Sequence, residues 1–343
     1  TKVGKFKYSR FINLLKSFSL YMGRALVLIS FGLNLLIIIS VGIRHDRLSA
    51  LNIPPIWVWS TIGIMICLLS MLFIRKTLPL IVCGCWILTT CILADEFRSL
   101  RKGVSPTLGK SKNISNPNSI RVVTINCNGR NLNIVRESLD FNPDIILTQE
   151  SPSPKELTSL LGESGNNEYK VIGGWDCAII AKGTLKKKKY PSVLFNHATG
   201  ATLTITNGTE IELLSLHLER AITRWDLWNI ECWREHTQRN AERRDQLVYL
   251  LEELKKQSSN KPIIFGGDFN SSYQSNLYEV IPEKFTNAFD EAGKGVGNTF
   301  TNYFPVIRID HIYPSNHFSI IDSRSVKTKN SDHRMVICDL IIN

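Results

Sequence analysis

The sequence predicts an α/β domain preceded by three transmembrane helices. Strand-like apolar runs alternate with helical stretches over roughly the last 230 residues, which is typical of an α/β fold. An excess of positive charge distinguishes the first part of the chain. The first 112 residues hold 15 Lys and Arg against 3 Asp and Glu, whereas the remainder holds 26 against 27. The formal net charge of +11 therefore belongs to a membrane region and does not indicate a large nucleic-acid-binding surface.

Three apolar runs form the predicted membrane region, residues 1–97. They cover about residues 20–43, 56–74 and 78–94. A transmembrane helix needs about 20 predominantly apolar residues, with a range of roughly 17–25. Each run is long enough, so the sequence predicts a multi-pass membrane protein that contacts the lipid bilayer through three helices.

The orientation in the membrane follows from the first helix. Lys and Arg are equally numerous on the two sides if the N-terminus is inside. The first helix usually dominates, and long domains cross the membrane largely regardless of their charge. We therefore expect the positively charged N-terminus to stay inside and the C-terminal domain to lie outside the cytoplasm.

Residues 98–119 are predicted to be a linker, because they are rich in Gly, Pro, Ser, Asn and Lys and show no periodicity. The α/β domain follows as residues 120–343. Its longest helical stretch runs from about residue 223 to 256, and most of the tryptophans at its start, Trp225, Trp228 and Trp233, are expected to pack in the core. The eight cysteines show no CxxC or zinc-binding spacing, and we expect buried free thiols.

Several predicted strands end in oxygen-bearing side chains or histidine. They end in TINCNG, LTQE, SLHL and GGDFN, another begins in RIDHI, and SDH precedes the last. Residues i and i+2 of a strand face the same side, so Asp268 and Asn270 can share one cleft, as can Asn126 and Asn128. The two glycines before Asp268 would allow close approach of a backbone or a phosphate. Oxygen ligands of this kind favour Mg²⁺ or Ca²⁺.

Each motif alone is weak, but their order resembles that of the endonuclease/exonuclease/phosphatase superfamily, the deoxyribonuclease-like fold. The resemblance covers about residues 120–342 and implies a four-layer α/β sandwich, with two packed mixed sheets flanked by helices. The matching positions are Asn126, Glu150, His217, Asp268, Asn270, Asp310, Asp332 and His333.

The resemblance also implies a metal site. Glu150 would be the main metal carboxylate, with Asn126 and Asp332 near it. The expected ion is Mg²⁺, with Mn²⁺ or Ca²⁺ as alternatives, and it would neutralise charge that develops on the phosphoryl oxygens. Asn128 stands where some abasic-site nucleases of the family carry Asp, which disfavours a second metal.

The same resemblance assigns catalytic roles. His333, oriented by Asp310, would contact the phosphate or activate water. Asp268 would position or deprotonate the attacking water, and Asn270 would bind a phosphate oxygen. His217 would assist the leaving group. Two family schemes exchange the acid and base roles, and the sequence does not choose between them.

We therefore expect a membrane-anchored, divalent-metal-dependent phosphoester hydrolase of the phosphodiesterase or nuclease type, acting by attack of water on a phosphoester. One alternative is a lipid-headgroup phosphodiesterase or phosphatase, sphingomyelinase-like or phosphoinositide-directed, which a site near the bilayer would favour. A further alternative is an inactive membrane receptor or scaffold that keeps the fold. The presence of every expected acidic and histidine position disfavours it.

Overall fold

The computed structural model describes residues 2–100, 102–103, 116, 118–189, 197–220, 224–257 and 260–343. It divides into two compact units, Thr1–Arg98 and Ser99–Asn343, which are described separately. Most of the predicted linker, residues 98–119, lies outside the described residues.

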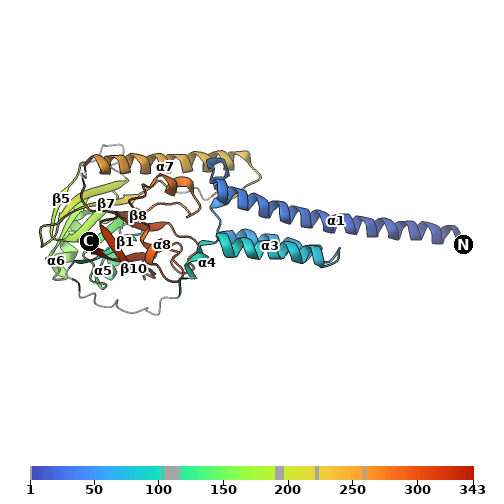
Figure 1. Ribbon diagram of the computed structural model, residues 1–343, viewed down its shortest axis with the longest axis horizontal. Coiled ribbons are helices and arrows are strands. Elements are labelled where there is room, and N and C mark those ends of the chain that lie inside the picture. The colour runs from blue at the N-terminus through green and yellow to red at the C-terminus, as the bar shows by residue number, and fades with distance from the viewer. Residues whose placement is uncertain are drawn as a thin grey trace. The chain divides into compact units, whose positions relative to one another are not determined.

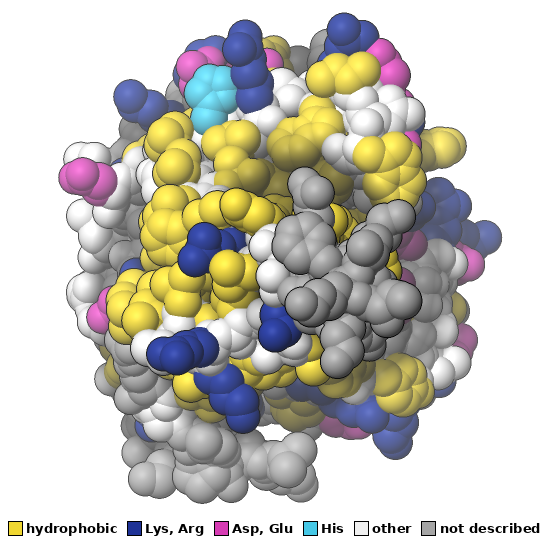
Figure 2. All heavy atoms as spheres, turned by 90° about the vertical axis from the view of Figure 1, so that its right-hand side faces the viewer, with side chains coloured by type: hydrophobic (Ala, Val, Ile, Leu, Met, Phe, Trp, Pro, Cys, Tyr) yellow, Lys and Arg dark blue, Asp and Glu magenta, His cyan; other side chains and the backbone are white. Residues whose placement is uncertain are grey.

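The N-terminal unit consists of helices. They are α1 (Lys2–Ile43), the 3₁₀ helix η1 (Asp46–Asn52), α2 (Ile56–Ser70) and α3 (Thr77–Leu93), and α4 (Asp95–Leu100) begins at its end (Figure 1). Trp86 of α3 is fully buried, and its ring fills the space left by Gly63 of α2. Its Nε1 donates a hydrogen bond of 2.9 Å to Ser30 Oγ of α1, which links all three helices. Hydrophobic side chains cover much of the outer face, with a few Lys and Arg among them (Figure 2).

The prediction of three membrane-spanning helices is corrected to one within the described residues. Residues 13–43 of α1 are long and apolar enough to cross a membrane. At 1.5 Å per residue, the 15 residues of α2 extend about 22 Å, short of the roughly 30 Å hydrocarbon core. Only together with η1, from which it is bent by 72°, does α2 reach a spanning length, and the 17 residues of α3 are also short.

The C-terminal unit contains two mixed sheets. The six-stranded sheet has the order β10-β11-β1-β2-β4-β3 and the five-stranded sheet the order β5-β6-β7-β8-β9. The strands of the first are β1 (Ser119–Asn126), β2 (Ile145–Gln149), β3 (Tyr169–Gly173), β4 (Ala178–Lys182), β10 (Phe318–Val326) and β11 (Met335–Ile342). Those of the second are β5 (Thr184–Lys187), β6 (Ala198–Thr204), β7 (Glu210–His217), β8 (Ile263–Asp268) and β9 (Asp310–Pro314). Each sheet has one parallel pair at its centre, β1 with β2 and β7 with β8.

Helices cover the outer faces of both sheets, which confirms an α/β sandwich (Figure 1). Helices α5 (Leu132–Leu139) and α6 (Pro154–Glu163) pack on the six-stranded sheet. Helix α7 (Ile230–Gln257) and the 3₁₀ helix η3 (Asn276–Val280) pack on the other, and the short α8 (Ala288–Ala292) contributes to the core between the sheets. The four cysteines of this unit, Cys127, Cys177, Cys232 and Cys338, are buried free thiols as expected.

The two glycines that end β8 are required by the neighbouring strands. A Cβ on Gly267 would lie 1.8 Å from the carbonyl oxygen of Leu216 on β7, and Gly267 has φ +148°. A Cβ on Gly266 would lie 2.6 Å from the carbonyl oxygen of His311 on β9. Of the two expected reasons for this pair, backbone or phosphate, the structure supports the backbone. The glycines let β7, β8 and β9 pack closely where each carries a site residue.

We predict that Gly267→Ala lowers the free energy of unfolding of the C-terminal unit by about 3 kcal/mol or more, because a backbone clash is added to an unfavourable φ. Gly162→Ala is the matched control. Gly162 lies in α6 with open space around its Cβ position, so alanine should leave stability unchanged or raise it by about 0.5–1 kcal/mol. Denaturant unfolding followed by circular dichroism measures both, and equal stabilities of the two variants would contradict the packing argument.

Candidate active site

Three predicted site residues lie in a row across the five-stranded sheet. His217 on β7 is opposite Asp268 on β8, and Asp268 is opposite Asp310 on β9. They continue the face that Ile264 presents to the core between the sheets, because side chains alternate along a strand. At this edge the inner face of the sheet therefore changes from apolar to ionisable.

The six-stranded sheet contributes polar side chains at the same edge. Asn126 ends β1 opposite Gln149, which ends β2. Gln149 Nε2 donates to Ser215 Oγ of the other sheet at 3.1 Å, and Asn126 Nδ2 donates to Asp268 Oδ2 at 3.2 Å. The two sheets thus converge on the carboxylate of Asp268, which is almost completely buried.

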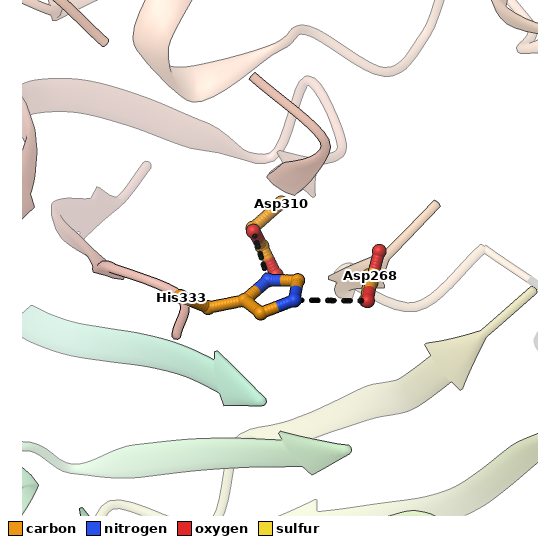
Figure 3. Close-up of side chains that lie close together, drawn as sticks. All are labelled: Asp268, Asp310 and His333. Carbon is orange, nitrogen blue, oxygen red and sulfur yellow. Dashed lines mark hydrogen bonds and ion pairs between the residues drawn. The ribbon is translucent and has the colours of Figure 1, made fainter. Parts of the chain in front are cut away.

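His333, just before β11, lies between two carboxylates (Figure 3). Its Nδ1 is 2.9 Å from Asp310 Oδ2 and its Nε2 is 3.8 Å from Asp268 Oδ2. Burial opposes protonation of the ring, but the charges of Asp310 and Asp268 prevail and raise the pKa of His333 to about 10. Burial in turn raises the pKa of Asp310, and the imidazolium opposes that rise.

The same three residues have ligand atoms within 4.8 Å of one another, close enough to hold a metal ion. A metal ion there would compete with the proton on His333, because only a neutral imidazole has a lone pair to offer an ion. Both nitrogens of His333 face carboxylates, one in a hydrogen bond to Asp310 and the other in an ion pair with Asp268. The three residues therefore form a charged relay in which a proton can be held and moved.

His217 supplies a second imidazole beside Asp268. Its Nε2 lies 3.6 Å from Asp268 Oδ2, and its Nδ1 lies 2.5 Å from Asp176 Oδ2. Burial lowers the pKa of His217, but the hydrogen bond to Asp176 and the charge of Asp268 outweigh it, so the pKa is raised. The carboxylate of Asp268 therefore lies between two imidazoles. Each imidazole also contacts a second carboxylate, Asp176 for His217 and Asp310 for His333.

Asp176 was not among the residues predicted for the site. It lies in the loop between β3 and β4, in the stretch GGWDCAIIAK, where the sequence shows a carboxylate and a tryptophan in place of the small residues common in the superfamily. This departure from the family pattern was the sequence feature that could have pointed to Asp176 as a site residue. Sequence spacing could not connect it to His217, because their contact joins residues 41 apart across two sheets.

Of the predicted metal-binding residues, Glu150 and Asp332 lie at the rim of this cluster, whereas Asn126 is buried beside Asp268. Glu150 follows β2 with φ +45°, Gly129 N donates to its Oε2 at 2.7 Å, and Arg220 Nη2 contacts its Oε1 at 2.6 Å. Asp332 is exposed, and its charge contributes to the raised pKa of His333. In the described part of the chain no hydrogen bond or ion pair joins Glu150, Asn126 and Asp332 to one another.

The expectation that Asn270 and Asn128 share a strand face with their neighbours is wrong. Both strands end two residues earlier, and φ is +49° at Asn270 and +39° at Asn128. Each backbone N–H donates to the side chain two residues before it, Asp268 Oδ1 and Asn126 Oδ1, at 2.9 Å. The side chains of Asn126 and Asp268 accept these turn hydrogen bonds, and asparagine tolerates the positive φ at positions 128 and 270. The side-chain amide of Asn270 donates to the carbonyl of Leu218 at 2.9 Å.

We predict that Asp176→Asn lowers the pKa of His217 relative to the unchanged protein, because burial stays and the hydrogen bond and charge of Asp176 are lost, although the charge of Asp268 remains. Two-dimensional NMR of the imidazole nitrogens during a pH titration measures this change. Asp322→Asn is the control, since Asp322 pairs with Arg324 on β10. A pKa of His217 that is the same in all three proteins would show that Asp176 does not hold the ring.

Comparisons with known proteins identify the family and the fold of the C-terminal unit. Residues 123–333 match the model of the Endonuclease/Exonuclease/phosphatase family. No curated protein sequence matches the chain. Among solved structures, a humanized D. rerio TDP2 is 18% identical over 65% of this chain and 99% of that chain, with a TM-score of 0.50. A Bacteroides thetaiotaomicron protein of the same family is 16% identical over 66% and 95%, with a TM-score of 0.53. A mannosyl-6-phosphatase from that organism is 17% identical over 65% and 100%, with a TM-score of 0.51.

Proposed function

Because the chain belongs to the endonuclease/exonuclease/phosphatase family, whose members hydrolyse phosphoesters, we propose that it is a divalent-metal-dependent phosphoester hydrolase of the phosphodiesterase or nuclease type, anchored to a membrane through α1. One observation carries the proposal. The buried carboxylate of Asp268 lies between the imidazoles of His217 and His333, at the edge where both sheets end.

This arrangement suits general acid–base catalysis of hydrolysis. Water adds its oxygen to phosphorus as the ester P–O bond breaks, so one proton must leave the water and one must reach the departing oxygen. Asp268 is the acceptor, and the two protonated imidazoles are donors to the phosphoryl and leaving oxygens. Which of His217 and His333 protonates the leaving group stays open, and Asp176 and Asp310 hold the two rings in place.

The oxygen donors beside the relay fit a divalent cation. Glu150 offers a partly exposed carboxylate, Asn126 a carbonyl oxygen and Asp332 an exposed carboxylate, and such oxygen donors are those that Mg²⁺ prefers. Mn²⁺ and Ca²⁺ are compatible with the same donors. A bound ion would neutralise charge on the phosphoryl group. We assign these three residues to the metal and the buried relay to proton transfer.

A lipid headgroup is the second candidate substrate, in a phosphodiester or phosphomonoester. Helix α1 favours it, because one span keeps the C-terminal unit close to a bilayer. With the N-terminus inside, one span also supports our proposal that the unit lies outside the cytoplasm. The fold itself does not decide, since the similar structures include a mannosyl-6-phosphatase and a TDP2 complexed with a single-strand DNA product.

A substrate panel tests the proposed function. The full chain in detergent is assayed with plasmid DNA, RNA, sphingomyelin, phosphoinositides and bis(p-nitrophenyl) phosphate, with Mg²⁺ and with a chelator. We expect Mg²⁺-dependent hydrolysis of the generic diester and of one natural class. Failure to hydrolyse any of them with Mg²⁺, Mn²⁺ or Ca²⁺ would favour the inactive receptor or scaffold.

We predict that Glu150→Gln removes metal-dependent turnover and leaves the fold intact, because the amide keeps the shape but loses the charge that attracts a divalent ion. Turnover is measured as a function of Mg²⁺ concentration. Glu163→Gln is the control, because Glu163 is an exposed glutamate at the end of α6 that accepts a hydrogen bond from Ser159 of the same helix. Near-full turnover of Glu150→Gln at limiting Mg²⁺ would overturn the metal assignment.

We predict that Asp268→Ala and His333→Ala each lower kcat by roughly 10²–10⁴-fold and that the double variant is little worse, since groups serving one transition state are strongly non-additive. Steady-state kinetics on bis(p-nitrophenyl) phosphate measures the three variants. Losses that simply multiply in the double variant would show that the two residues act independently.

A further inference from the structure

Three large apolar side chains project into solvent just before and at the start of α7. Trp225 is 55% exposed, Trp228 89% and Ile230 63%, and we refer to these three residues as the tryptophan ledge. The sequence led us to expect these two indoles in the core, and that expectation is wrong. Helix α7 begins only at Ile230, so both tryptophans precede the face that packs on the sheet.

The ledge is held in place by polar contacts at its base. The guanidinium of Arg224 makes two bonds to Asp226, of 2.6 and 2.8 Å, and a third of 2.8 Å to Glu235 of α7. Trp233 Nε1 donates to the carbonyl of Leu227 at 2.8 Å. Several hydrogen bonds therefore stabilise a turn that exposes two indoles. An exposed apolar patch of this kind usually marks an interaction surface.

We infer that the tryptophan ledge docks the C-terminal unit on the surface of a phospholipid bilayer. Tryptophan concentrates at the membrane–water interface, because its ring is apolar and its N–H is polar, and an isoleucine beside it adds a purely apolar contact. A bilayer is also the partner that the chain itself keeps within reach, since residues 13–43 of α1 are long and apolar enough to cross one.

The charges around the ledge favour a bilayer over single-stranded nucleic acid. Platforms that stack bases combine aromatic rings with a positively charged groove. Here Arg224 is bound to Asp226 and Glu235, and Arg234 is paired with Glu231 at 2.5 Å. The arginines next to the ledge are thus already neutralised by acids, which suits a zwitterionic lipid surface.

The position of the ledge connects docking to the active site. Arg220, which contacts Glu150, precedes Trp225 by five residues, so the Cα atoms of the two residues lie within about 18 Å of each other whatever the path between them. A ledge seated in the headgroup layer would bring the open edge of the site close to lipid phosphoesters. This consequence rests on the proposed function, and it assigns the substrate to the class of lipid headgroup phosphoesters.

Hydroxyl-radical footprinting of the full chain in phosphatidylcholine nanodiscs tests the docking. Tyr249 serves as internal control, because it is 38% exposed on α7 and lies 21 residues beyond Trp228, about 30 Å along the helix. We expect Trp228 to be oxidised about fivefold more slowly than its exposure predicts, since an interfacial side chain is buried roughly 5–10 Å into the headgroup boundary. Tyr249 should react as its exposure predicts. Reaction of Trp228 at the rate set by its 89% exposure would overturn the inference.

Two further measurements distinguish docking on a bilayer from binding of single-stranded nucleic acid. Trp228→Asp should abolish the protection of Trp225, whereas Tyr249→Asp should keep it. Protection of Trp225 and Trp228 that appears only when a single-stranded oligonucleotide is added would identify a base-stacking platform and would also overturn the inference. The footprint needs neither turnover nor metal, so its failure and failure of the proposed hydrolase are distinguishable.

Discussion

The close packing of β7, β8 and β9 is the constraint on which the candidate site depends. Only glycine fits at position 267, because a Cβ there would meet the carbonyl oxygen of Leu216. The close pairing that glycine permits places His217, Asp268 and Asp310 opposite one another on the three strands. Because the row is set by backbone pairing, the ionisable groups are held rigidly before any substrate arrives, as catalysis by positioned groups requires.

The second sheet completes the site through side chains. Asn126 reaches Asp268 from the end of β1, and His333 reaches it from the start of β11. Burying several ionisable groups together is costly, and the cost is offset only where opposite charges and hydrogen bonds are matched. Here Asp176, Asp268 and Asp310 surround two imidazoles, so their carboxylates stabilise both rings in the protonated form. This match of acids to imidazoles makes the cluster stable and also suits it to proton transfer.

Much of this arrangement could be predicted from the sequence. The order of the short motifs indicated the family and the sandwich, because each motif lies next to the start or the end of a strand, where a pattern of few residues is informative. Asp176 could not be found in this way, since its role depends on a contact between two sheets. Asn270 was placed on a strand face because periodicity cannot show where a strand ends. The membrane helices were overestimated because hydropathy does not reveal where a helix ends, since α2 ends at Ser70 although the apolar run continues to residue 74.

The central claim is that the buried Asp268–Asp310–His333 cluster moves protons and that the cation binds at the rim. Anomalous diffraction from crystals grown with Mn²⁺ tests it directly, because the ion itself is located. We expect an anomalous peak within bonding distance of Glu150, with Asn126 and Asp332 near it. A peak coordinated by Asp268, Asp310 and His333 would contradict the account.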